Sequence, residues 1–219
     1  MVTFSLSRRR AIFSALLVFT MQSVQALAAT GSDALVREIA TRLAKTDALR
    51  ARFTQTRTLA AMKAPLVSRG DLLMMRESGI VWRIREPYQT TFVLDETGVT
   101  ELDANGARAG RRKNGMRASA GASQASAMVR AILAGDLSSL YSQFDIQASG
   151  TPDRWTMSLT PNQPQLLQMI ANVRVEGGAF LSNVLITSPN GDTTCFEFGA
   201  VTPLTRFSEA ERALFEAVR

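Results

Sequence analysis

The chain has 219 residues, of which 46% are hydrophobic and 20% charged, and its formal net charge is +6. This composition indicates a globular chain, with one sizeable domain or two small ones, rather than a disordered one. There is no histidine and only one cysteine, Cys195. His-based catalytic triads, His metal sites, imidazole acid–base catalysis and an internal disulfide bond are therefore excluded.

The first residues follow a three-part pattern. Arg8, Arg9 and Arg10 precede an apolar run over residues 11–24, and Ala26-Leu27-Ala28 follows it. A basic start, a short apolar middle and an A-x-A end are typical of a secretory signal peptide, and the run is too short for a good membrane span. We expect cleavage after Ala28, or else after Ala29, and a soluble periplasmic domain over residues 29–219.

The mature chain carries little net charge. Taking the three arginines of the signal from 25 basic residues leaves 22, against 19 acidic residues. This excess is too small to indicate a nucleic-acid partner.

A helix and a strand are predicted first. Asp33 can cap a helix start, and apolar residues follow with helical spacing, namely Leu35, Val36, Ile39, Leu43 and Leu49. This spacing predicts a helix over Asp33–Leu49. Polar and apolar residues then alternate over Arg52–Leu59, which predicts a strand.

Three strands are predicted between Gly70 and Asp95: Gly70–Arg76, Ile80–Arg85 and Thr90–Asp95. Strand side chains alternate between the two faces, so one face of the predicted sheet is apolar while the other carries Asp71, Arg83 and Arg85. Arg76 is expected on the apolar face as well. That face carries Leu72, Met74, Ile80, Trp82, Ile84, Phe92 and Leu94.

The middle of the chain combines turns, a basic run and short helices. A strand over Val99–Asp103 leads to tight-turn signals at Asn105-Gly106 and Asn114-Gly115, with a basic patch at residues 111–113. Small polar residues over 116–127 predict a pliable linker. Two short apolar helical segments follow, over 128–133 and 137–141. They form either an independent flap or a fixed connection that covers the end of the barrel.

Hairpins resume in the C-terminal half. Strands are predicted over 144–148, 155–160, 173–176, 181–188 and 193–199, with Trp155 and Met157 on one face. A helical turn is expected over Pro164–Ile170, and a helix with a capping box of Ser208 and Glu211 over Ser208–Val218. Cys195 lies in a strand as a buried, inert thiol. The fold class is mainly β: nine to eleven strands in one curved antiparallel sheet or incomplete barrel, with a leading helix.

Several short motifs occur in an order typical of one known family. They resemble the periplasmic outer-membrane lipoprotein carrier (LolA-like) proteins over about Ala34 to Thr202. The motifs are Phe53-Thr54-Gln55, Gly70-Asp71-Leu72, Arg76, Trp82, Glu86-Pro87, Ile132-Leu133-Ala134-Gly135, Trp155 with Leu159-Thr160-Pro161, and Asn190-Gly191 before Thr193-Thr194.

The resemblance implies an incomplete barrel with a helical lid over a hydrophobic cavity. Such a carrier takes acyl chains of lipoproteins from an inner-membrane ATP-driven complex to an outer-membrane acceptor. It implies a cavity lined by the apolar face named above together with Trp155 and Met157. Arg76 is then the latch that hydrogen-bonds the lid. Lid residues are Met128, Ile132, Leu133, Leu137 and Leu140.

Two departures from the family pattern bear on function. Glu77 follows Arg76 where the family usually has Pro, and the tail predicts a helix where the family has an extended segment. The cargo is thus an acylated lipoprotein or a related lipid, and we expect a monomer without metal or cofactor. Carboxylate pairs such as Asp95/Glu96 lie beside turns, so an enzyme is not expected. The alternative is a periplasmic lipid-sensing regulator of the RseB-like half-barrel type.

Overall fold

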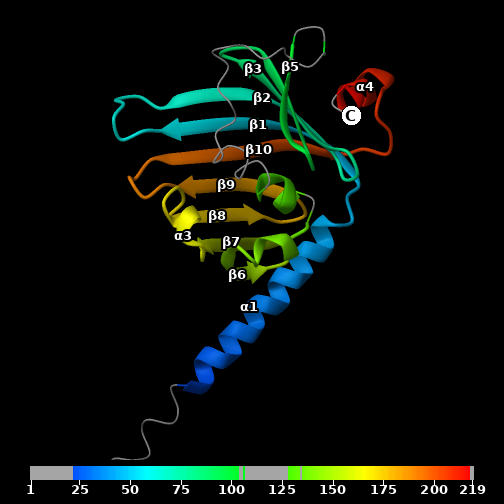
Figure 1. The fold of residues 1–219 in the computed structure, drawn as a ribbon. Helices are drawn as coiled ribbons and strands as arrows, with labels where there is room; N and C mark the ends of the chain where they lie inside the picture. The colour runs from blue at the N-terminus through cyan, green and yellow to red at the C-terminus, as the bar shows by residue number, and fades with distance from the viewer. Residues whose placement is uncertain (1–21, 104–105, 107–127, 134, 218–219) are drawn as a thin grey trace, which may run out of the picture.

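The computed structural model describes residues 22–103, 106, 128–133 and 135–217. These residues form one ten-stranded antiparallel sheet in the order β5-β4-β3-β2-β1-β10-β9-β8-β7-β6 (Figure 1). Consecutive hairpins build each half, and the pairing of β1 with β10 joins the halves. The strands are β1 Ala48–Thr58, β2 Leu66–Met75, β3 Gly79–Glu86, β4 Thr90–Asp95, β5 Gly98–Leu102, β6 Phe144–Thr151, β7 Arg154–Pro161, β8 Asn172–Gly177, β9 Leu181–Thr187 and β10 Thr193–Pro203.

Helices cover both faces and one edge of the sheet. The long helix α1 (Gln22–Leu43) lies against the edge strand β6, where Ser32 Oγ accepts a hydrogen bond of 2.8 Å from the backbone N–H of Ala148. A helix over residues 128–133 and a 3-10 turn η1 (Ser138–Leu140) lead into β6. The remaining helices are α3 (Pro164–Leu167) and α4 (Glu209–Glu216).

The leading helix differs from its prediction at both ends. In the full chain α1 starts at Gln22, so Asp33 lies inside the helix and does not cap it. It ends at Leu43, and Leu49 belongs to β1. Leu49 fits either pattern, because it is also in step with Ala51 and Phe53 on one face of a strand. The turn over 44–47 decides between the two patterns.

The sheet separates two hydrophobic cores. The inner face, with Leu72 and Met74, belongs to a large cluster shared with α1 and with residues 128–140. The outer face carries a small cluster of Leu73, Val81, Val93 and Leu102 around Phe215 of α4. Most of the buried apolar side chains therefore lie on the inner side of the sheet.

The predicted strands are confirmed, as are the mainly β class and the capping box of α4, in which Ser208 and Glu211 bond each other's backbone N–H groups. Other predictions fall outside the described residues: most of the signal peptide, the turn at Asn114-Gly115, the basic patch at 111–113 and the linker at 116–127. Among the helices that are described, none is long and apolar enough to span a membrane.

Candidate functional site

The inner face brings the predicted cavity residues together. Phe92 and Ile84 are half-buried, and the others are buried in one cluster: Leu72, Met74, Ile80, Trp82, Leu94, Trp155 and Met157. The predicted lid residues Met128, Ile132, Leu133, Leu137 and Leu140 are buried in the same cluster. The predicted lid, described over residues 128–133 and 135–140, is here called the cover. The cover and the inner face of the sheet therefore share one apolar interior.

An aromatic group from β3, β1 and β10 lies in this interior. The Trp82 ring centroid lies 4.1 Å from that of Phe53, 5.5 Å from Phe196 and 6.2 Å from Phe198. Both contacts with β10 are edge-on, a favourable arrangement for aromatic pairs. Trp82 thus bridges the two halves of the sheet.

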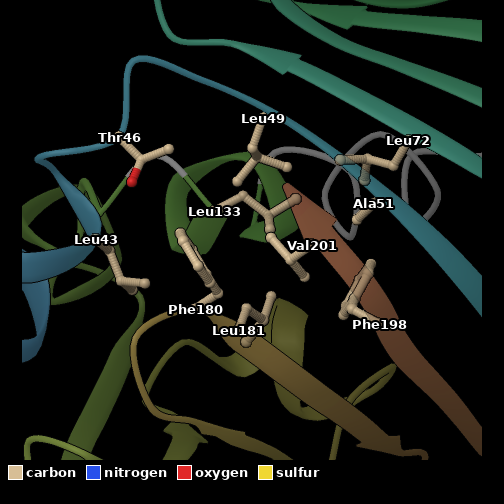
Figure 2. Close-up of a pocket in the computed structure, with 10 residues that line it drawn as sticks. All are labelled: Leu43, Thr46, Leu49, Ala51, Leu72, Leu133, Phe180, Leu181, Phe198 and Val201. Carbon is tan, nitrogen blue, oxygen red and sulfur yellow. The ribbon is translucent and has the colours of Figure 1, made fainter. Parts of the chain in front are cut away.

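A small pocket remains beside this group (Figure 2). Its free volume is about 10 Å³, which is room for roughly one water molecule. The described side chains therefore leave little free space at this point of the interior. The lining is apolar except for Thr46 and consists of Leu43, Thr46, Leu49, Ala51, Leu72, Leu133, Phe180, Leu181, Phe198 and Val201.

An irregularity in β10 shapes one wall of the pocket. The register of β1 against β10 shifts between Arg50 and Arg52, and Ala200 adopts a positive φ of 49°. Phe198 and Val201 are three residues apart, so a regular strand would place them on opposite faces. The bulge lets both line the pocket, and bulges often re-aim side chains in this way.

Arg76 lies at the end of α1, next to this pocket. Its Nη2 donates hydrogen bonds to the carbonyl oxygens of Leu43, Ala44 and Thr46 at 3.3, 2.7 and 3.0 Å. Its Nε lies 3.4 Å from Asp47 Oδ1. A guanidinium that binds the last carbonyls of a helix satisfies their hydrogen bonds and opposes the helix dipole. The predicted bond from Arg76 to the 128–140 cover stays a prediction.

Gly135 joins the cover to the same place. It has φ +70°, and a Cβ there would lie 2.7 Å from the Ala40 carbonyl oxygen and 2.8 Å from the Ala44 nitrogen. Its own N–H donates to the Ile132 carbonyl, and that of Asp136 donates to Ala131. The helix over 128–133 therefore ends in a turn that fits only a glycine against α1.

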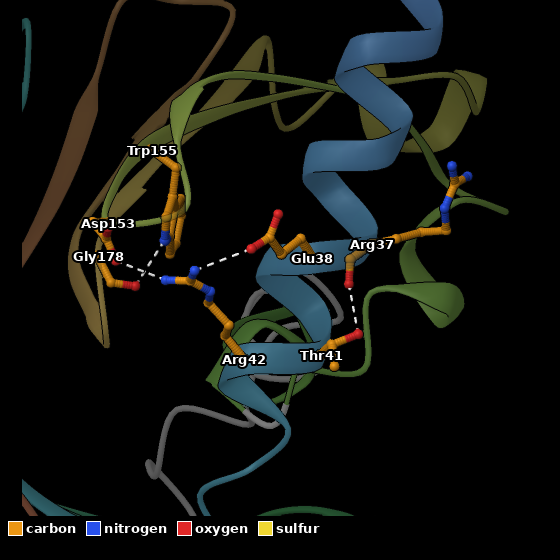
Figure 3. Close-up of polar contacts among 7 residues, drawn as sticks. All are labelled: Arg37, Glu38, Thr41, Arg42, Asp153, Trp155 and Gly178. Atoms are coloured by element: carbon orange, nitrogen blue, oxygen red, sulfur yellow. Dashed lines mark hydrogen bonds and ion pairs between the residues drawn. The ribbon is translucent and has the colours of Figure 1, made fainter.

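One ion pair joins α1 to the turn between β6 and β7 (Figure 3). Arg42 pairs with Asp153 at 2.7 Å and with Glu38 at 3.0 Å. Nearby, Trp155 Nε1 donates to the Gly178 carbonyl at 2.9 Å. The Asp153 side chain is 88% exposed, so the ion pair is a weak fastening.

The described residues include possible metal ligands and the single cysteine. No cluster of three or more possible metal-ligating residues occurs among them. Cys195 is half-buried rather than fully buried, and its Sγ lies 3.4 Å from Asn183 Oδ1. Burial, with the nearby Glu197 carboxylate, raises the pKa of the thiol. Its thiolate form is thereby disfavoured, in agreement with the prediction of an inert thiol.

Comparison with models of protein families identifies the family of this chain. The family model described as "Outer membrane lipoprotein carrier protein LolA-like" matches residues 28–198. The chain belongs to the LolA-like family. No curated protein matches it significantly.

Solved structures with similar folds include other LolA-like proteins. A LolA superfamily protein from Nitrosomonas europaea is 9% identical, with TM-score 0.43, 82% of this chain and 96% of that chain covered. A lipoprotein-sorting protein domain from Vibrio parahaemolyticus is 8% identical, with TM-score 0.40 and coverages of 85% and 99%. MucB, in the MucA/MucB complex of Pseudomonas aeruginosa, is 13% identical, with TM-score 0.46; 80% of this chain aligns with only 59% of MucB.

Within this LolA-like chain, sequence reasoning found only Leu72 and Leu133 of the ten pocket residues. The missed ones come from the end of α1, the turn after it, β1, the β8–β9 turn, the start of β9 and β10. Alternation at Leu49, Ala51 and Phe53 was a usable signal for β1. No local signal brings Thr46 and Phe180 to one pocket, since that depends on the pairing of distant strands.

Proposed function

We propose that this LolA-like protein carries an acyl chain of a lipoprotein, or of a related lipid, between its sheet and its cover. The observation that supports this most directly is the shared interior. Five side chains of the cover are buried on the apolar inner face, which is where hydrocarbon of another source can replace them. The small pocket at Thr46 and Phe180, which Leu133 of the cover also lines, lies in this interior.

The free energy gained by burying an acyl chain is similar to the free energy lost by exposing the cover side chains. Removing a chain of roughly sixteen carbons from water gains about 13 kcal/mol, at about 0.8 kcal/mol per methylene. Exposing the five cover side chains costs about 1.5–3 kcal/mol each, or roughly 8–15 kcal/mol. The closed and loaded forms thus differ by a few kcal/mol, as a carrier that must also release its cargo requires.

The end of α1 is the natural control point for this exchange. Arg76 orders the turn after α1, and Gly135 of the cover packs against the same helix end. Arg76 acts as the proposed latch by holding the surface on which the cover closes, with or without a direct bond to the cover. Charge-assisted hydrogen bonds of about 1.5–3 kcal/mol have a suitable size for this role.

The rest of the proposal follows from the family. A signal peptide ending at Ala28 exports the chain, and the domain over residues 29–219 works in the periplasm as a monomer. It receives cargo from an inner-membrane ATP-driven complex and delivers it to an outer-membrane acceptor. Its role is binding and transport rather than catalysis, and it needs no cofactor.

The decisive experiment is native mass spectrometry of the protein purified from the periplasm without detergent. We expect a fraction that carries an acylated species, whose mass identifies the class of cargo. Transfer of that species from inner-membrane to outer-membrane vesicles distinguishes a carrier from a lipid-sensing regulator. Protein that is empty in every preparation contradicts the proposal.

A matched pair of glycine variants tests the exchange itself. Gly135→Ala pushes the cover away from α1, so binding of an apolar fluorescent probe should rise. Gly191→Ala is the control, because Gly191 has a similar φ of +86° but only open space within 4 Å of the place where a Cβ would lie. Both variants carry the strain of a left-handed residue. Equal probe binding by the two shows that the cover does not gate the interior.

The latch is tested separately with Arg76→Leu. This variant loses the bonds to the three carbonyl oxygens after α1, so we expect faster loss of bound cargo to an acceptor. Unchanged release contradicts the latch but leaves the carrier proposal intact.

A further inference from the structure

The two ends of the strands differ sharply in character. At one end lie five described connections, residues 59–65, 87–89, 141–143, 162–171 and 188–192. Hydrogen bonds hold several of them side by side: Ala60 N–H donates to Asp192 Oδ1 at 2.7 Å, and Asn162 N–H donates to the Gln143 carbonyl at 3.0 Å. These connections and the first two residues of β2 are here called the apolar rim.

Large exposed apolar side chains gather on this rim. All seven of those described lie there, in four of the connections and at the start of β2: Met62, Leu66, Val67, Tyr88, Tyr141, Leu167 and Met169. Tyr88 is 79% exposed. Single exposed apolar residues are ordinary, but a group on one end of a molecule indicates an interaction surface.

Charge follows the opposite distribution. Within its five connections the apolar rim has two charged residues, Lys63 and Asp192. The connections at the other end, over 44–47, 76–78, 96–97, 152–153, 178–180 and 204–208, are shorter in total. They carry Lys45, Asp47, Arg76, Glu77, Glu96, Asp153 and Arg206. Among the connections described in full, those of the apolar rim are therefore the less costly to remove from water.

Cations stand just behind the apolar tips. Lys63 sits at the β1–β2 tip among Ala60, Ala61, Met62 and Ala64. Arg57 is exposed on β1, opposite Leu66 and near the Asp192 carboxylate. Arg69 is exposed further along β2, where it pairs with Glu86 at 3.3 Å. Apolar and Tyr side chains at the tip, with basic residues behind them, match the acyl–headgroup boundary of an anionic bilayer.

We propose that the apolar rim docks this protein on the surface of an anionic lipid bilayer. Tyr88, Met62 and Leu167 enter the interface, and Lys63 and Arg57 reach the lipid phosphates. The charged end, with Arg76 and the pocket, then faces water and stays open to a protein partner. This docking surface lies at the opposite end of the strands from the pocket. The proposed docking can therefore be tested whether or not the protein carries a lipid.

A tryptophan probe tests the orientation. Trp82 and Trp155 are only 8% and 2% exposed, so they add a nearly constant background. With vesicles of phosphatidylethanolamine and phosphatidylglycerol, the emission of Tyr88→Trp should shift to the blue and be quenched by brominated lipid. Glu96→Trp, on an exposed turn of the charged end, should change little. Equal responses of the two probes, or none, overturn the proposal.

Vesicle sedimentation measures the energetic share of the rim. The triple variant Met62→Ser, Tyr88→Ser, Leu167→Ser should bind roughly tenfold more weakly or worse, since three apolar contacts are lost. The control Lys45→Ser, Glu77→Ser, Glu96→Ser changes three exposed residues at the other end and should bind like the parent chain. The parent chain and both triple variants have the same N-terminus, so the apolar residues 11–24 contribute equally to the vesicle binding of each. A blue shift that rises with protein concentration without lipid would instead assign the rim to a second copy of the chain and overturn the bilayer.

Discussion

The two faces of the sheet are built from the same strands but are covered in different ways. On β2 and β3 the inner positions are Leu72, Met74 and Trp82, whereas the outer positions include Asp71 and Arg83. The outer apolar patch is small, and one helix with one aromatic side chain, Phe215, is enough to cover it. The inner face is broad and needs both α1 and the 128–140 segment.

This difference supports the proposal that the inner cover, rather than α4, exchanges with cargo. The outer helix α4 is fixed by its capping box, by an ion pair between Arg50 and Glu211, and by Phe215. The inner cover contributes mainly apolar side chains to the interior. In the proposed exchange, the hydrocarbon of the cargo replaces these side chains. Substitutions on each face test the contrast.

The largest effect is expected from Trp82→Ala on the inner face. The change removes the ring between Phe53, Phe196 and Phe198, and it should lower the free energy of unfolding by about 3–5 kcal/mol. Urea unfolding measures the loss. The control Tyr88→Ala, at a side chain 79% exposed, should change stability by less than about 0.5 kcal/mol. Similar values for both variants would mean that the aromatic group does not join the two halves.

A smaller loss is expected from Phe215→Ala on the outer face. Phe215 is buried among Leu73, Val81 and Val93, and its removal should cost about 3 kcal/mol or slightly less, because the patch is small and near solvent. Binding of an apolar probe to the inner pocket should stay unchanged. Arg212→Ala, on the exposed side of α4, is the matched control for stability. Altered probe binding in Phe215→Ala would show that the two faces are coupled.

Much of the fold was predictable because its signals are local. A period of two placed Leu72, Met74, Trp82 and Phe92 on one face, and the Ser208-to-Glu211 spacing predicted the start of α4. These patterns depend on neighbouring residues alone. Leu72 and Trp82 also belong to the family motifs, so two separate signals predict the inner face of the sheet.

The missed features depend on distant contacts. The end of α1 at Leu43 reflects a turn that β1 and Arg76 stabilise from outside the helix. Val201 lines the pocket because of a bulge that alternation cannot predict. That all the exposed apolar tips share one end of the sheet follows only once every strand direction is known.

A third prediction concerns the pH dependence of the outer cover. Partial burial raises the pKa of Glu211, but the Ser208 backbone N–H and hydroxyl and the Arg50 guanidinium lower it more, so the pKa lies below its ordinary value of 4.5. The stabilisation is therefore present above pH 4.5 and is lost as the pH falls through the lowered pKa. Glu211→Gln should cost about 1 kcal/mol at neutral pH and flatten the acid limb of a stability-versus-pH curve. An unchanged acid limb would assign the pH dependence to other carboxylates.

The smallest effect is expected from Arg42→Ala, which removes the ion pair that joins α1 to Asp153 and the pair with Glu38 within α1. The side chains lie largely in water, where screening and lost side-chain entropy cancel most of the attraction. Thermal unfolding should change little, and added salt should remove even that difference. Ile39→Ala, one turn away and fully buried, should be clearly destabilising because it removes apolar packing from the same helix. A large effect of Arg42→Ala would show that α1 is held by charge rather than by the inner core, and the contrast between the two faces would then rest on electrostatics.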